Sequence, residues 1–210
     1  MKFVNILFWL LLITLNSCNS NDNDALNKNN MQQQEKGRQK RDLDKQGLQE
    51  EEKITLTAEE EKLFNSLQTA FQYTIEKLSN QIQGCNNGNK SKCTDFFNWL
   101  SKDIQKQKEL ANAFKKVYDF LDKKRQEKAN NKDFDTYIKG GIDCQANNAN
   151  GNNCNDGKHG NINDTNEIEQ YFRGVANDIF NKNDPDEIYK CFKEELLDEN
   201  NHYASLSSWN

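Results

Sequence analysis

The chain has 210 residues, of which only 34% are hydrophobic, and it carries a formal net charge of −5 at pH 7. That length fits one domain with additional segments, and the apolar share is low for a compact globule. The negative charge is spread along the chain without the basic patch of a nucleic-acid-binding protein, so we exclude nucleic acid as a partner. Pro185 is the only proline, which favours helices joined by Asn/Gly loops over a β-sandwich or barrel.

Residues 1–17 have the features of a lipoprotein signal peptide. Lys2 gives a positive start, and the apolar run ILFWLLLITL is only about half of the roughly 20 residues that span a bilayer. The following LNSC resembles a bacterial lipobox, with an aliphatic residue three places before Cys18 and a small residue directly before it. We expect the Cys18 sulfur to carry a diacylglyceryl group and its new amino group to be acylated, because stable anchoring needs more than one acyl chain. The alternative is an ordinary signal peptide with a chance cysteine.

Residues 18–53 are predicted to be the lipidated cysteine and a disordered tether. The segment contains almost no large apolar side chain, so it buries too little surface to offset the entropy of ordering it. A flexible coil of this length spans roughly 30 Å. The stretch RQKRDLD within it is either a solvated linker or a recognition or sorting motif.

Residues 54–200 are predicted to form a helical head. Thr57 and Glu60 make a capping-box pattern, and Gly84 is a stop signal for the first helix. Apolar residues between them recur at three- and four-residue steps: Phe64, Leu67, Phe71, Ile75 (or Thr74), Leu78 and Ile82.

A longer second helix is predicted over residues 94–128. Its apolar stripe is Phe97, Leu100, Ile104, Ala111, Phe114, Tyr118 and Leu121. A short helix over residues 133–141, with Phe134, Tyr137 and Ile138, ends at a Gly-Gly pair. A polar loop of about 20 residues follows, a length typical of loops that are functional, disordered or closed by a covalent bridge.

Two further helices complete the predicted head. Asp164 and Glu167 form a capping pair for the first, and Asp184 with Pro185 begins the second. Their stripes are Ile168, Tyr171 (or Phe172), Val175 and Ile179, then Ile188, Cys191 (or Phe192) and Leu196. We therefore predict an all-α fold, an irregular bundle of four main helices and one short helix, with residues 201–210 as a C-terminal tail.

Three stretches of the chain resemble the multicopy lipoprotein (Mlp) family of Lyme-disease-type spirochaetes. They are the start NSCNSN, the tether motif RQKRDL (the likeness covers residues 39–43), and the C-terminal EIEQYFRGVANDIFNKND followed by EIYKCFKEEL. The resemblance implies a lipoprotein anchored through Cys18, displayed on the outer surface and antigenic in the host. It also implies a plasmid- or prophage-borne multigene family, and it brings no catalytic residue with it.

Five cysteines remain once Cys18 is assigned to the lipid. Outside the reducing cytosol disulfides persist. Cys85 and Cys93 bracket a short segment, as do Cys144 and Cys154, and each local bridge would contribute about 2–3 kcal/mol. Cys191 is then either a small buried hydrophobe or half of a long-range bridge to the Cys144–Cys154 loop, and spacing does not choose.

Metal and catalytic patterns are absent from the sequence. Cys144, Cys154 and His159 are near one another but match no compact zinc spacing, and His202 is distant. The Asn/Gly-rich loop places no Glu at the twelfth position of a calcium loop. There is no G-x-S-x-G elbow, P-loop or dinucleotide glycine pattern. We predict no metal, no cofactor and no enzymatic activity.

The functional hypothesis is a lipid-anchored protein of the outer membrane and cell surface. Its head would bind a host protein or serve in immune evasion. Two alternatives remain: a variable coat or decoy antigen without a specific ligand, and a periplasm-facing envelope lipoprotein.

Overall fold

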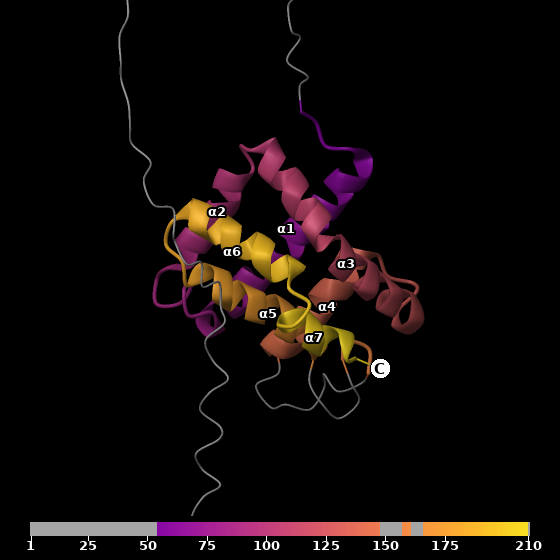
Figure 1. Cartoon of the computed structure of the whole chain (residues 1–210). Helices are drawn as coiled ribbons and strands as arrows, with labels where there is room; N and C mark the ends of the chain where they lie inside the picture. Colours follow the sequence, from indigo (N-terminus) through magenta and orange to yellow (C-terminus); the bar gives the residue numbers. More distant parts are fainter. Residues whose placement is uncertain (1–53, 148–156, 161–165, 210) are drawn as a thin grey trace, which may run out of the picture. The chain divides into compact units, whose positions relative to one another are not determined.

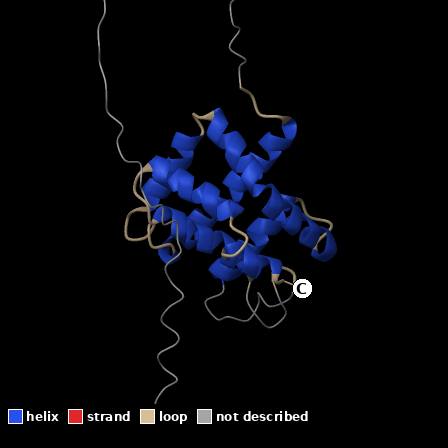
Figure 2. Cartoon of the chain, in the orientation of Figure 1, coloured by secondary structure: helices blue, strands red, loops and turns tan. Residues whose placement is uncertain are grey.

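The computed structural model describes residues 54–147, 157–160 and 166–209 (Figure 1). Within these ranges every regular element is a helix, which confirms the predicted all-α class (Figure 2). The elements are α1 (Ala58–Leu78), the 3₁₀ helix η1 (Ser79–Gln81), α2 (Lys90–Leu100), α3 (Ile104–Lys128), α4 (Phe134–Asn147), α5 (Glu167–Phe180), α6 (Pro185–Leu197) and α7 (His202–Ser207). The predicted signal peptide (1–17) and tether (18–53) lie outside the described residues.

Helix α1 begins where the sequence predicts. The Glu60 amide donates to Thr57 Oγ1 at 3.2 Å, and the Thr57 amide donates to Glu60 Oε2 at 2.8 Å, so the capping box is complete. The predicted apolar stripe is buried along its whole length, from Phe64 to Ile82. The α-helix ends at Leu78 and η1 ends at Gln81, so helical structure stops short of the predicted stop at Gly84.

The core is organised around α1, which packs against α2, α3, α4 and α5. Phe71, near its middle, is 0% exposed. Its ring makes edge-to-face contacts with Phe172 of α5, at 5.1 Å between centroids, and with Phe192 of α6, at 4.7 Å. Such pairs contribute about 0.5–1.5 kcal/mol beyond the area they bury. One aromatic side chain therefore joins three helices.

The long second helix predicted over residues 94–128 is wrong, because the chain breaks into α2 and α3 at residues 101–103. Asp103 adopts an extended conformation, and its side chain accepts a hydrogen bond from the Lys106 amide at 3.0 Å, which makes it the N-cap of α3. Short polar side chains compete for backbone hydrogen bonds in this way. The new start places Ile104 on the surface, 40% exposed, so its assignment to the buried stripe is also wrong.

The predicted stop at the Gly-Gly pair is wrong as well, since α4 continues through Gly140 and Gly141 to Asn147. Gly141 is used for close packing. A Cβ there would lie 3.0 Å from Cγ2 of Ile168, at the start of α5. Because glycine has no side chain, α4 and α5 can approach each other closely here. The glycine lowers the intrinsic helix propensity of α4 in return.

The C-terminal tail predicted for residues 201–210 contains helix α7, which packs on α5. Leu206 and Trp209 are buried there. Helix α5 is capped by Asn166, which accepts from the Glu169 amide at 3.0 Å, whereas the predicted cap Asp164 lies outside the described residues. The predicted start of α6, with Asp184 as N-cap and Pro185 first in the helix, is confirmed.

Replacing Phe71 with alanine should lower the free energy of unfolding by about 3–5 kcal/mol, because the substitution leaves a cavity where three helices meet. Urea unfolding followed by circular dichroism measures the loss. Phe120→Ala is the control, since Phe120 is only partly buried at the edge of the core. Equal losses in the two variants would contradict the central role of Phe71.

Candidate functional site

The predicted cysteine sites are only partly within the described residues. Cys85 and Cys93 form a disulfide, with 5.9 Å between their Cα atoms, and both side chains are buried. The bridge ties the segment after η1 to the first turns of α2. It is one of the two local bridges that the sequence spacing offers.

The other cysteines extend this pattern. Cys144 in α4 and Cys191 in α6 each take part in a disulfide, while Cys18 and Cys154 lie outside the described residues. Cys191 is therefore more than a small buried hydrophobic residue. Its side chain is 1% exposed, and it is also disulfide-bonded.

The two histidines lie in different surroundings. His159 is buried against Tyr137, with 5.4 Å between ring centroids, and α4 passes close to it at Gly140. His202, which the sequence places in a tail, is the first residue of α7. Helix packing brings it to Asp178 on α5 and Glu195 on α6.

These three side chains form one compact cluster, the α5–α6–α7 cluster. Nε2 of His202 lies 2.7 Å from Oδ2 of Asp178 and 3.9 Å from Oε2 of Glu195. Glu195 is 4% exposed, and its Oε2 accepts a hydrogen bond of 2.8 Å from the Asn201 amide group. Burial raises the pKa of Glu195, and the negative charge of Asp178 raises it further. The cluster thus holds two carboxylates and an imidazole together, with Glu195 buried and with Asp178 and His202 half-buried.

A cavity of about 240 Å³ lies beside this cluster, between α5 and α7. His202 forms part of its wall, and so do Tyr171, Arg173 and Gly174 of α5. A Cβ at residue 174 would lie 2.6 Å from Cε1 and Nδ1 of His202. Glycine at this position is therefore what gives the imidazole room to reach Asp178.

Tyr171 carries an unexplained polar group in the same wall. The residue is 2% exposed, and its hydroxyl oxygen is buried without a hydrogen-bond partner among the described residues. Burial raises the pKa of this hydroxyl, and the Glu195 carboxylate adds to the effect. A buried hydroxyl left unpaired is costly, so a polar partner at this point would stabilise the fold.

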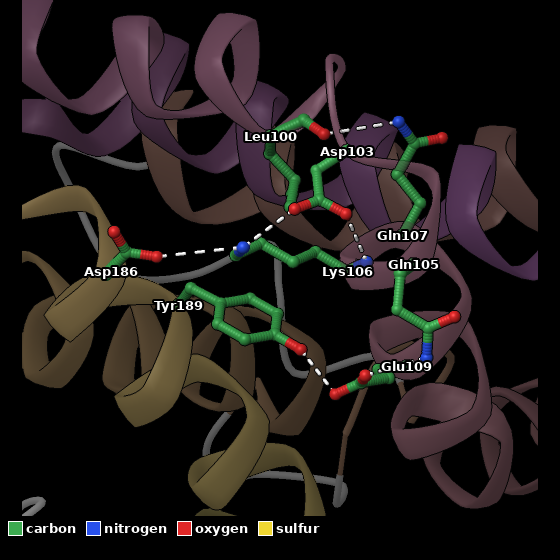
Figure 3. Close-up of polar contacts among 8 residues, drawn as sticks. All are labelled: Leu100, Asp103, Gln105, Lys106, Gln107, Glu109, Asp186 and Tyr189. Atoms are coloured by element: carbon green, nitrogen blue, oxygen red, sulfur yellow. Dashed lines mark hydrogen bonds and ion pairs between the residues drawn. The ribbon is translucent and has the colours of Figure 1, made fainter. Parts of the chain in front are cut away.

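A second polar network lies on the surface between α3 and α6 (Figure 3). Oε2 of Glu109 accepts from the Tyr189 hydroxyl at 2.6 Å and from Nζ of Lys193 at 2.8 Å, while Oε1 accepts from Gln105 at 2.9 Å. The Lys193 ammonium, followed by the Tyr189 and Gln105 donors, lowers the pKa of Glu109 to about 2.

Lys106 continues this network toward the start of α6. Its Nζ lies 2.7 Å from Oδ2 of Asp103 and 3.7 Å from Oδ1 of Asp186 (Figure 3). The same ammonium lies over the rings of Trp99 and Tyr189, at 5.3 and 5.4 Å from their centroids. The side chains of this α3–α6 face are thus fixed by one another.

Together these features define an all-helical, disulfide-containing head. Among the described residues, no helix is both long and apolar enough to cross a membrane. The chain belongs to the Mlp lipoprotein family, whose family model matches residues 32–192. The resemblance seen in the leader, tether and C-terminal motifs is confirmed, and the match includes the middle of the chain as well.

Relatives from Borreliella burgdorferi match almost end to end. The chain is 62% identical to "Lipoprotein MlpJ", with 99% of this chain and 98% of that protein covered. It is 56% identical to "Lipoprotein MlpB" over the same shares, and 40% identical to "Lipoprotein MlpF" over 75% of this chain and 99% of that one. No solved structure is significantly similar to the chain. Membership of a lipoprotein family implies attachment to a membrane through a lipid.

The Glu109→Gln variant should lose stability at neutral pH and much less in acid. Because the folded-state pKa of Glu109 lies below its ordinary value of 4.5, the stabilisation is complete above about pH 5 and is lost as the pH falls toward about 2. We expect a loss of about 1–2 kcal/mol at pH 7, since the carboxylate is partly screened by solvent. Urea unfolding at pH 7 and pH 3 measures it.

Glu127→Gln is the matched control on the same helix, because Glu127 is exposed near the end of α3. Its difference from the wild type should be small and should not change with pH. A Glu109→Gln loss that is the same at both pH values would contradict the assignment of the low pKa to this network.

Proposed function

We propose that the chain is an outer-surface lipoprotein, anchored by lipid on Cys18, whose helical head acts by binding a host protein or in immune evasion and has no catalytic activity. The observation that carries the proposal is the position of Cys18. It follows a short apolar leader and a lipobox-like LNSC in a chain that belongs to a lipoprotein family. A lipid at that residue, followed by residues 19–53, would leave the head free of the membrane surface.

The α3–α6 face supports a binding role for the head. Its charged and aromatic side chains, among them Lys106, Glu109 and Tyr189, already hold one another in place before a partner arrives. Side chains ordered in advance lose less conformational entropy when a complex forms. A partner for this face would present alternating charges, because both signs are displayed within it.

A second candidate function, a coat or decoy antigen without a ligand, has its own support. Among the described residues, the large hydrophobic side chains that are exposed are few, namely Ile54, Ile104 and Leu197. Protein-binding surfaces more often gather such residues into one patch. A third candidate is an envelope lipoprotein that faces the periplasm.

Substituting Cys18 with alanine should abolish incorporation of radiolabelled palmitate, because the sulfur that accepts the diacylglyceryl group is gone. Growth with labelled fatty acid and immunoprecipitation of the chain measures this. The Cys85→Ala/Cys93→Ala double variant is the control and should label like the wild type, since it removes two cysteines but not the anchor. Label that persists in Cys18→Ala would refute the assigned anchor.

Proteolysis of intact cells separates surface display from a periplasmic location. If the head is displayed on the surface, protease added to intact cells should digest it. If the head faces the periplasm, the outer membrane should shield it from the protease. A soluble periplasmic marker must remain uncut in the same sample. A head that is cut only after the outer membrane is opened would support the periplasmic candidate instead.

Binding measurements then separate the interaction role from the coat role. The protein should bind one or more serum or matrix proteins saturably at micromolar concentration, and the α3–α6 face variant Lys106→Glu should weaken that binding. Absence of saturable binding across the array would favour the coat.

A further inference from the structure

We infer that the head binds a divalent transition-metal ion, of the Zn²⁺ or Mn²⁺ class, through Asp178, Glu195 and His202 of the α5–α6–α7 cluster. The inference goes beyond the proposed function and does not depend on it. A metal at this point would hold the last helix, α7, to α5 and α6.

The geometry of the three ligand atoms suits such an ion. One nitrogen and two carboxylate oxygens lie within 4.8 Å of one another, with Nε2 of His202 2.7 Å from Asp178 and 3.9 Å from Glu195. Ions bound by these groups sit about 2.0–2.2 Å from each ligand, which places the ligands roughly 3–3.5 Å apart. To reach that range the His202–Asp178 distance has to lengthen and the His202–Glu195 distance has to shorten, each by under about 1 Å.

The chemistry of the donor set selects the class of ion. Imidazole nitrogen is a ligand for Zn²⁺, Fe²⁺ and Ni²⁺, and carboxylates are shared with Mn²⁺. Mg²⁺ and Ca²⁺ prefer sites made of oxygen alone. The histidine therefore argues for a transition metal over the alkaline-earth ions.

Electrostatics favours a cation at this position. Asp178 and Glu195 place two carboxylates beside the His202 imidazole, and Glu195 is 4% exposed. Like charges held a few ångströms apart repel each other, and a positive charge close to both lowers that repulsion. A dication between the two carboxylates supplies that charge.

The cavity beside the cluster gives an independent indication of a ligand. The buried Tyr171 hydroxyl has no hydrogen-bond partner among the described residues and belongs to the wall that His202 also lines. Three protein ligands leave at least one coordination position for water. A cavity of about 240 Å³, lined in part by His202, has room for such water.

Two neighbours hold the ligands in position. Asn201 donates to Oε2 of Glu195 at 2.8 Å, and Gly174 leaves the space that the His202 ring occupies. Contacts of this kind orient ligands in metal sites. Asn201 and Gly174 are positioning residues, since neither offers a ligand atom to the cluster.

Equilibrium dialysis of the full-length chain, purified in a neutral detergent and stripped with a chelator, tests the site. We expect one Zn²⁺ per chain with saturable binding, weaker binding of Mn²⁺, and none of Mg²⁺ at the same concentrations. The apparent melting temperature should rise with Zn²⁺, because a ligand that binds only the folded state stabilises it. A wild-type chain without saturable Zn²⁺ or Mn²⁺ binding would overturn the inference.

Variants locate the ion. Asp178→Asn, Glu195→Gln and His202→Gln should each weaken Zn²⁺ binding at least tenfold while the helical circular dichroism is kept. Glu194→Gln is the matched control, because Glu194 is exposed and directly precedes Glu195. Wild-type affinity in any of the three folded ligand variants would place the ion elsewhere and overturn the assignment.

Cobalt substitution distinguishes a metal ligand from a residue that only supports the fold, because the absorption bands of Co²⁺ depend on its ligands. Co²⁺ bound at the cluster should show visible absorption bands that depend on the ligand nitrogen. His202→Gln should lose or shift these bands, and Gly174→Ala should weaken Co²⁺ binding by displacing the ring without removing a ligand. Bands identical in the wild type and His202→Gln would exclude His202 as a ligand.

Discussion

The contact of Phe71 with Phe172 and Phe192 is the interaction on which the rest of the head depends. Helix α1 packs against four other helices, and at Phe71 it meets α5 and α6 at once. Because close-packed aromatic rings tolerate little displacement, this contact fixes how α5 and α6 lie relative to each other. Their relative position decides where Asp178 and Glu195 lie, and with them the docking of α7. The functional candidates at the C-terminal end therefore depend on a side chain more than a hundred residues earlier in the chain.

The helical core could be predicted because burial repeats with the helical period. The stripes of α1, α5 and α6 have apolar residues at steps of three and four, and those residues are buried. The prediction fails where local chemistry overrides the period. Asp103 caps a new helix inside a continuous apolar stripe, and Gly141 serves close packing where it reads as a stop. The Asp103 cap is a local hydrogen bond, whereas Gly141 packs against Ile168 of another helix, and periodicity reports neither.

The α5–α6–α7 cluster escaped sequence reasoning for a related reason. Asp178 and His202 are 24 residues apart, and they meet only after three helices pack. One signal was nevertheless present. Glu195 falls on the same face of α6 as Ile188, Cys191 and Phe192, and it is buried with them. A carboxylate on an apolar stripe needs a partner, because an isolated buried charge is strongly unfavourable. The sequence pattern places His202 in a tail, because the six residues of α7 are too few to show a helical period.

Family membership and the metal inference stand on different parts of the chain. The family model ends its match at residue 192, so Glu195 and His202 lie beyond it, and only Asp178 of the three lies within it. The lipoprotein assignment rests instead on the matched range and on relatives that align almost end to end. A head without bound metal would leave the proposed anchor unaffected, because Cys18 and the cluster share no residue. Conversely, a metal ion that holds α7 to α5 and α6 would stabilise the head whether or not the chain is attached to a membrane. The same chain thus combines the lipid attachment that its family implies with a site that only the packing of its last three helices creates.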